Sequence, residues 1–353
     1  MRFTFSLPSF VLIFLLAMTL SAQAQPSPDL SMFTPQAYKA REVHAAVEMR
    51  VVGDGAQRAY LFVPAQPRVE DAIPVVLFHH GWQGMNPMNF GALIDHLVRS
   101  GHAVIYPVYQ DSEHTPPPLV TDNAGYANRQ ALNVLSQEFG LIPRPGQTLY
   151  YGFSVGSAIS INLALNAEHY GLPPADAMML VSPGDAYHVD NGRWTQSIYG
   201  PVEMLPANLP VVIITGEDDD IGLPTARKLA ARLGHIPREH RIMLVVPSSS
   251  YNGRKVMAGH GSPGAPDSRY NFSLQRYHFP DILQGLPEYE ASASLNQLDF
   301  YGYWKIADGL LDGLKSDSFA ATIFGDGTDQ QLSLGFWEDG TALNPMKIEE
   351  LCP

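Results

Sequence analysis

The stretch from 148 to 160 constrains the fold more than any other part of the sequence. Residues 148–151 have the composition of a short buried strand, and an apolar helical pattern follows from 155 to about 167. Between them lies Gly152-Phe153-Ser154-Val155-Gly156, a G-x-S-x-G motif. A strand that turns into a helix within one residue strains the corner residue, and the flanking glycines let neighbouring backbone pack where a Cβ would clash. Ser154 is therefore expected to project above the sheet at the positive end of a helix, as a nucleophile would, although an ordinary strand-to-helix turn with a small hydroxyl is the alternative.

The rest of the chain alternates short apolar runs with helical periodicity, which is typical of an α/β protein. Two early strands flank the turn residues 53–55 and are expected to pair antiparallel. The later runs are continuously apolar, as in strands buried on both faces. We therefore predict a mainly parallel central sheet with helices on both faces. The expected strands are 43–51, 59–63, 73–78, 102–108, 148–151, 177–182, 211–215 and 241–246, and the expected helices are 90–100, 120–138, 155–167, 224–233 and 295–314.

An acidic cluster follows one of these strands. The strand 211–215 runs directly into Gly216-Glu217-Asp218-Asp219-Asp220, and ligands of parallel sheets bind at such carboxyl ends. One carboxylate here could hold an imidazole in the correct tautomer and stabilise its protonated form. The spacing Gly216-x-x-Asp219 favours Asp219, with Asp218 as the alternative. Four adjacent acids could instead form a solvated turn or a set of calcium ligands.

A nucleophilic Ser154 needs a base that folding must bring to it. The histidines after the acidic cluster are His235, His240, His260 and His278. The first two flank a helix-to-strand connection, at the wrong end of the sheet, and His278 lies in a less flexible stretch. His260 has a glycine on each side, which allows its ring to reach over a pocket. We predict His260 as the base; a loop histidine with a surface hydrogen bond is the alternative.

The run His79-His80-Gly81-Trp82 ends the strand expected at 73–78. A tetrahedral intermediate needs two N–H donors aimed at its oxyanion, and we expect them from Val155, which follows the nucleophile, and from Trp82. Trp82 and His80 are also predicted to contact the substrate. Adjacent histidines could suggest a metal, but no third ligand has suitable spacing, so neither a metal nor a cofactor is expected.

Taken in order, these motifs resemble the α/β-hydrolase family across roughly residues 43–315. The resemblance implies an α/β-hydrolase fold and acyl transfer to water through an ester intermediate on Ser154. Within the family, the chain is similar to secreted dienelactone-hydrolase-like and platelet-activating-factor-acetylhydrolase-like serine esterases. The acidic cluster and the sequence Gly335-Phe-Trp-Glu-Asp-Gly340 depart from the general pattern. A serine at this strand-to-helix corner disfavours the family branches that use a carboxylate nucleophile.

Two other functions remain open. A serine peptidase or amidase would need a site for the leaving amine and usually an N-terminal gating domain, for which residues 25–42 leave no room. A binding protein on a hydrolase scaffold would usually have lost the serine or the histidine. We therefore expect a hydrolase of small-molecule carboxylic esters, whose acyl and alcohol groups the sequence does not specify.

The N-terminus has the features of a cleaved signal peptide, and an uncleaved anchor is the alternative. Arg2 precedes the apolar run 10–20, and Ala22 and Ala24 form an A-x-A cleavage site. We expect residues 1–24 to be removed, giving a secreted or periplasmic protein without a membrane anchor. The single cysteine, Cys352, allows no intramolecular disulfide. With 22 basic and 35 acidic residues, the net charge of −13 argues against nucleic acid as a partner and leaves the oligomeric state open.

Two segments of the expected single domain, 25–353, have less regular patterns. The aromatic segment 183–209 is expected to form a lid or substrate wall, or else a loop packed on its own side chains. In the C-terminal segment 320–353, Asp326-Gly327 and Asp339-Gly340 are turn sequences between short apolar runs. We predict that this segment forms a small β-meander.

Overall fold

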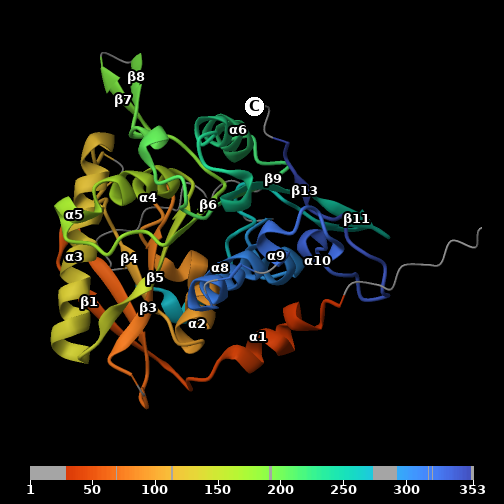
Figure 1. The fold of residues 1–353 in the computed structure, drawn as a ribbon, viewed down its shortest axis with the longest axis horizontal. Helices are drawn as coiled ribbons and strands as arrows, with labels where there is room; N and C mark the ends of the chain where they lie inside the picture. The colour runs from red at the N-terminus through yellow and green to blue at the C-terminus, as the bar shows by residue number, and fades with distance from the viewer. Residues whose placement is uncertain are drawn as a thin grey trace, which may run out of the picture.

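The computed structural model describes residues 29–350 apart from 69, 113, 191–192, 273–291, 317 and 320. The predicted signal segment 1–24, the alternative base His278 and Cys352 lie outside the described residues. In the part that is described, no helix is both long enough and apolar enough to cross a membrane. The described chain forms one large sheet, two separate hairpins and helices that cover the sheet on both sides (Figure 1).

The large sheet contains nine strands among the described residues, in the order β1-β2-β4-β3-β5-β6-β9-β10-β13. The strands from β4 to β10 run parallel to one another, whereas β1, β2 and β13 at the edges pair antiparallel. The predicted mainly parallel sheet is confirmed, and the arrangement is that of an α/β-hydrolase fold. The strands are β1 Val47–Val52, β2 Ala59–Pro64, β3 Ala72–His79, β4 Ala103–Pro107, β5 Ile142–Phe153, β6 Ala177–Val181, β9 Val211–Gly216, β10 Arg241–Val246 and β13 Lys347–Ile348.

Two hydrophobic layers separate the sheet from its helices. One layer packs α3, α4 and α6 against the sheet, and the other packs α1, α2, η8 and α8 against the opposite face. The α-helices are α1 Pro35–Arg41, α2 Gly91–Arg99, α3 Val120–Phe139, α4 Val155–Leu165, α5 Ala167–Tyr170, α6 Gly222–Arg232, α8 Lys305–Ser316, α9 Ala321–Phe324 and α10 Asp329–Leu332, and η8 Asp299–Trp304 is a π-helix. Short 3₁₀ turns are η1 Ser31–Phe33, η2 Gly55–Gln57, η3 Pro87–Phe90, η4 Pro117–Leu119, η5 Val202–Met204, η6 Arg238–His240 and η7 Ser268–Tyr270.

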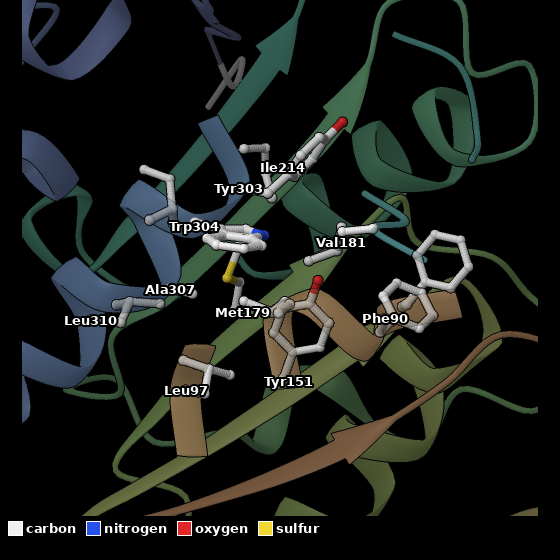
Figure 2. Close-up of a cluster of buried hydrophobic side chains, with 14 of the residues drawn as sticks. Phe90, Leu97, Tyr151, Met179, Val181, Ile214, Tyr303, Trp304, Ala307 and Leu310 are labelled. Carbon is white, nitrogen blue, oxygen red and sulfur yellow. The ribbon is translucent and has the colours of Figure 1, made fainter. Parts of the chain in front are cut away.

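The alternation of side chains along β5 shows why both layers are needed. Tyr150 belongs to the layer under α3 and α4, whereas its neighbour Tyr151 belongs to the layer under α2 and α8, and both are fully buried. Tyr151 stacks on Phe78 of the adjacent strand with ring centroids 4.2 Å apart. Figure 2 shows Tyr151 beside Met179, Trp304 and other side chains of this layer. A strand with large side chains on both faces is stable only when both faces are covered.

The prediction of a C-terminal β-meander is wrong. Its described residues instead form the two short helices α9 and α10, one isolated bridge between Phe336 and Ala342, and β13. The Asp339-Gly340 turn lies between the two residues of that bridge. Asp326-Gly327, with φ values of 49° and 86°, instead connects two helices. A pair of left-handed residues reverses the chain whatever elements flank it. The strand β13 adds to the edge of the large sheet by pairing with β10.

Two hairpins were not predicted. The strands β7 Tyr187–Asp190 and β8 Arg193–Ser197 lie within the segment 183–209, and Figure 1 shows them projecting from the body of the molecule. The strands β11 Ser249–Tyr251 and β12 Arg254–Val256 flank Asn252-Gly253, which has φ values of 48° and 75°. Asn-Gly is a strong hairpin sequence, so the second hairpin could have been read from the sequence.

Candidate active site

Ser154 occupies the corner between β5 and α4. Its backbone has φ 53° and ψ −125°, a strained conformation for a residue with a side chain. Its N–H donates to the Val181 carbonyl at 2.9 Å, which fixes the corner to the next strand. A Cβ on Gly156 would lie 2.0 Å from the His79 carbonyl oxygen, so only glycine allows the helix to approach β3 this closely. The G-x-S-x-G pattern therefore reflects backbone crowding around one serine, which is itself buried.

Three predicted residues from distant parts of the chain meet at this corner. The Nε2 atom of His260 lies 3.0 Å from Ser154 Oγ. The Nδ1 atom of the same ring lies 2.8 Å from Asp219 Oδ1. Ser154 follows β5, Asp219 follows β9, and His260 lies beyond β10 and the β11–β12 hairpin. Because parallel strands end at the same edge of a sheet, their following loops converge there.

The carboxylate of Asp219 is buried and is held by several donors. Its Oδ1 accepts from the N–H groups of Ile221 at 3.1 Å and Gly222 at 2.6 Å, and its Oδ2 accepts from the Thr215 hydroxyl at 3.2 Å. Burial acts to raise the pKa of Asp219, but the hydrogen bonds from His260 and Gly222 outweigh it, and the pKa lies below its usual value. The group is therefore ionised at neutral pH and orients the imidazole.

The neighbouring acids face elsewhere. Asp218 is exposed, and its Oδ2 accepts from the Ser248 hydroxyl at 2.6 Å rather than from His260. Glu217 accepts from the Ser248 N–H at 2.8 Å and from Lys347 Nζ at 3.1 Å. Among the described residues, no group of three or more His, Cys, Asp or Glu side chains is arranged to hold a metal ion.

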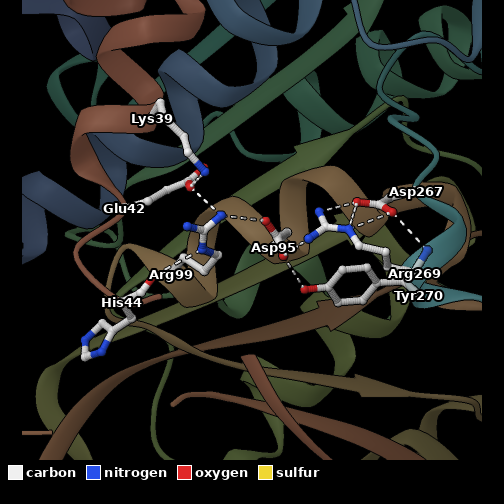
Figure 3. A network of polar contacts seen from close by, with 8 residues as sticks. All are labelled: Lys39, Glu42, His44, Asp95, Arg99, Asp267, Arg269 and Tyr270. Atoms are coloured by element: carbon white, nitrogen blue, oxygen red, sulfur yellow. Dashed lines mark hydrogen bonds and ion pairs between the residues drawn. The ribbon is translucent and has the colours of Figure 1, made fainter. Parts of the chain in front are cut away.

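The segment after His260 is tied to α2. The Ala265 carbonyl accepts from the Ala92 N–H at 3.0 Å. Figure 3 shows the charged network beyond it, in which Arg269 contacts Asp267 and Asp95 and the Tyr270 hydroxyl donates to Asp95 at 2.9 Å. The His260 loop is thus attached at its C-terminal side to a helix packed on the sheet.

The other described histidines after the acidic cluster lie away from this corner. His235 follows α6, and its Nε2 lies 2.9 Å from the Leu205 carbonyl oxygen. His240 ends η6, directly before β10. Both are at the end of the sheet where the parallel strands begin, opposite to Ser154.

The predicted N–H donors lie on backbone next to the nucleophile. Val155 is the first residue of α4, so its N–H has no acceptor within the helix. A Cβ on Gly81 would lie 3.1 Å from Ser154 Cβ, which places the Gly81-Trp82 turn beside the elbow. In the part of the chain that the structure describes, the Trp82 N–H donates to no backbone carbonyl of a turn, loop or helix cap. The Trp82 ring is half-buried against the layer under α3.

His80 is not placed to bind substrate, contrary to the prediction. Its ring is fully buried and stacks on Tyr109 with centroids 4.0 Å apart. Its Nδ1 lies 2.6 Å from the Gly81 oxygen and its Nε2 2.9 Å from the Val108 oxygen. Burial lowers the pKa of His80 to about 4, against the opposing effect of these carbonyls, so the ring is neutral at pH 7 and only one contact is a hydrogen bond. The ring supports the Gly81-Trp82 turn from below.

His79 has a similar buried role. Its Nδ1 lies 2.7 Å from the Ser160 hydroxyl, and its Nε2 lies 3.0 Å from Asn128 Nδ2. Burial lowers the pKa of His79 to about 3. A neutral ring accepts from Asn128 and donates to Ser160, which links β3 to α3 and α4.

Sequence reasoning missed Gly184, which lies directly over the nucleophile. A Cβ at this position would be 2.7 Å from Ser154 Oγ and 3.2 Å from the Val155 nitrogen. The Gly184 carbonyl accepts from the Tyr199 hydroxyl at 2.9 Å, and the Gly200 N–H donates to Asn162 of α4 at 2.7 Å. Gly184, just before β7, therefore borders the nucleophile, whereas Gly200, after β8, is attached to α4. The sequence suggested a lid or substrate wall over 183–209, but nothing in it singled out Gly184.

The chain has distant likenesses among known structures. No protein-family model and no curated protein sequence matches the chain. Similar solved structures include carboxyl esterase 2 from the mycorrhizal fungus Tuber melanosporum, at 17% identity and a TM-score of 0.44, covering 64% of this chain and 84% of that one. A thermostable esterase from Pseudomonas putida has 20% identity and a TM-score of 0.41, covering 57% of this chain and 72% of that one. Likenesses at this level carry no argument about activity.

Proposed function

We propose that this protein is a serine hydrolase that cleaves carboxylic esters through a covalent acyl intermediate on Ser154. The observation that supports the proposal is the continuous contact from Ser154 Oγ through both ring nitrogens of His260 to Asp219. In the reaction, His260 accepts the Ser154 proton while Oγ attacks the ester carbonyl, and then returns it to the departing alcohol. A water molecule, activated by the same imidazole, releases the acid and restores the serine.

Two backbone donors would stabilise the oxyanion of the tetrahedral intermediate. The Val155 N–H projects from the first turn of α4, where the helix dipole favours negative charge. The Trp82 N–H would supply the second hydrogen bond. The buried carboxylate of Asp219 stabilises the imidazolium that forms in each half of the reaction.

We propose neutral esters with short to medium acyl chains as substrates. Burial of apolar acyl carbon stabilises binding by about 0.8 kcal/mol per methylene, so the specificity should rise with chain length until the chain meets the wall of the site. The net charge of −13 slows the encounter with anionic substrates. A peptidase or amidase, and a non-catalytic binding protein on this scaffold, are the alternatives.

The first experiment tests the three residues with p-nitrophenyl esters. Ser154→Ala should lower kcat by about 10⁴-fold or more, and Asp219→Asn should lower it somewhat less. Asp218→Asn is the matched control and should leave kcat unchanged, because Asp218 faces Ser248. A crippling effect of Asp218→Asn with a silent Asp219→Asn would contradict the assignment of the acid.

The same assay separates the alternatives. A fluorophosphonate should label Ser154 in an enzyme and not in a binding protein. Across C2 to C16 esters, kcat/KM should peak below C12, and EDTA should have no effect. A maximum at C12 or above would indicate a lipase-like groove, and loss of activity in EDTA would indicate a calcium site in the acidic cluster. Faster cleavage of matched anilides than of esters would favour an amidase.

We also propose that the protein is exported and that residues 1–24 are removed. The support is the sequence pattern alone, a positive residue, an apolar run and an A-x-A site.

A further inference from the structure

We propose, on the basis of the function proposed above, that Tyr303 is a positioning residue for His260, because its hydroxyl holds the turn that carries the histidine through Ser262. Tyr303 lies more than 40 residues beyond His260, on η8, and belongs to no motif in the sequence. It contacts neither Ser154 nor Asp219 by a hydrogen bond in the described chain, so its effect on the reaction would be indirect.

The turn around His260 is closed by Ser262. The Ser262 N–H donates to the Gly259 carbonyl at 3.1 Å, and the Ser262 hydroxyl donates to the same oxygen at 2.8 Å. Gly259 and Ser262 therefore bracket His260 in one compact turn. The hydroxyl of Tyr303 lies 2.7 Å from Ser262 Oγ.

The direction of this last hydrogen bond follows from proton counting. A serine hydroxyl has a single proton, and that of Ser262 is directed at the Gly259 carbonyl. The Tyr303 hydroxyl must then be the donor to Ser262 Oγ. The result is a chain of two hydroxyls from Tyr303 through Ser262 to the residue directly before His260. Both side chains are fully buried, so water does not compete for these hydrogen bonds.

The Tyr303 hydroxyl keeps its proton at working pH. Burial raises the pKa of Tyr303 above its usual range, and the nearby carboxylates of Asp219 and Asp299 act in the same direction. The group is therefore a permanent donor.

The histidine turn needs an external support, and η8 supplies a rigid one. Gly259, Gly261 and Gly264 give the turn wide backbone freedom. Tyr303 instead comes from a helix that packs on the sheet, and Figure 2 shows it next to Trp304. The Trp304 ring stacks on His96 with centroids 5.1 Å apart. π-Helical turns are frequent at functional sites, and here the π-helix presents Tyr303 toward the turn.

The test compares Tyr303→Phe with Tyr151→Phe. Both tyrosines are fully buried in the same layer, but the Tyr151 hydroxyl has no hydrogen-bond partner among the described residues. Tyr303→Phe should lower kcat for a short p-nitrophenyl ester by about 10- to 100-fold with KM within about twofold, because a displaced base mainly affects the chemical step. The rate of fluorophosphonate labelling should fall in parallel. Tyr151→Phe should change neither quantity.

A double-mutant cycle shows whether the effect passes through Ser262. Ser262→Ala should cause a similar loss of kcat, and the Tyr303→Phe/Ser262→Ala double variant should lose little more than either single variant. Hydrogen exchange of the peptide around 256–265 should be faster in Tyr303→Phe than in the wild type and unchanged in Tyr151→Phe. The thermal midpoint of each variant is measured as well, because a strongly lowered midpoint would show that a loss of kcat is due to unfolding.

The outcomes separate this inference from the proposed function. A wild-type protein without ester activity and without labelling overturns both. An active wild type in which Tyr303→Phe keeps full kcat overturns the role of Tyr303 alone. Equal losses of kcat in Tyr303→Phe and Tyr151→Phe would show a general disturbance of the core. Fully additive losses of kcat in the cycle would show that Ser262 does not transmit the effect. Either result also overturns the positioning role of Tyr303.

Discussion

Ser154 shows how a single residue can be both strained and indispensable to a site. Its left-handed φ of 53° costs on the order of 1–3 kcal/mol, which the surrounding core must offset. The same corner sets the hydroxyl at the start of α4 and within 3.0 Å of His260 Nε2. The strain is therefore tied to the position that the proposed nucleophile needs.

At the same scale, Gly184 gives a direct steric prediction. In Gly184→Ala, the new Cβ would lie 2.7 Å from Ser154 Oγ and 3.2 Å from the Val155 nitrogen. It would occupy space needed by the ester carbonyl, so we expect kcat/KM to fall by about 100-fold or more. The measurement is the rate of fluorophosphonate labelling, with the thermal midpoint as the check on folding. If the folded Gly184→Ala protein were labelled at the wild-type rate, this would show that the substrate does not occupy the space next to Gly184.

At the scale of elements, α8 holds the C-terminal tail through one buried lysine. Lys305 Nζ donates to the carbonyls of Gln331 at 2.8 Å and Ser333 at 2.9 Å, at the end of α10. The last carbonyls of a helix have no partner within the helix, and here Lys305 supplies one. This interaction explains how a four-residue helix remains ordered in a tail that the sequence suggested would form strands.

The buried amine of Lys305 should also make the free energy of unfolding depend on pH. Burial lowers the pKa of Lys305 to about 7, whereas an exposed lysine in the unfolded chain has a pKa near 10.5. Between these values the unfolded chain binds a proton that the folded chain does not, so this group makes stability rise with pH. The free energy of unfolding of the wild type, relative to Lys305→Met, should therefore increase from pH 7 to 9.5, by at most about 1.4 kcal/mol per pH unit.

Urea unfolding at several pH values measures this difference. Lys315→Met is the matched control, since Lys315 is exposed on the same helix. The difference in the free energy of unfolding between Lys315→Met and the wild type should not change with pH. A flat difference for Lys305→Met as well would show that the buried amine keeps its proton throughout this range.

At the scale of the whole molecule, the site depends on the shared edge of the parallel strands. Loops after β5, β9 and β10 converge there, and α2 and η8 support the loop with His260 from the other side. The two hydrophobic layers keep these strands in register, with neither a disulfide nor a metal cluster among the described residues.

Export is a prediction about the whole chain. If residues 1–24 are removed after Ala24, the exported protein should begin at Gln25, and its intact mass should match residues 25–353. The measurement is mass spectrometry of the protein from the extracytoplasmic fraction. A mature chain that still contains Met1 would contradict the prediction, and Arg2→Glu, which removes the positive residue, should slow export.

Local patterns were sufficient for the order of most elements and for the elbow. The apolar runs of β3, β4, β6, β9 and β10 and the glycines around Ser154 are each visible within about ten residues of sequence, because burial on both faces and backbone crowding leave local marks. Sequence spacing favoured Asp219, and the glycine on each side of His260 favoured that histidine. Spacing could not show that Asp218 turns to Ser248, since that depends on a residue 30 positions away.

What the sequence by itself determined was a mainly parallel sheet with a serine at a tight strand-to-helix corner. Tertiary structure alone decided which side chains surround that corner: it buried His80 between Tyr106 and Tyr109, laid Gly184 over Ser154 and brought Tyr303 to Ser262 in the turn that carries His260. The same packing turned an expected meander into short helices, of which α10 is held by Lys305. The reason is that periodicity records which face of an element is buried, whereas the contacts between distant elements depend on how those buried faces fit together in space.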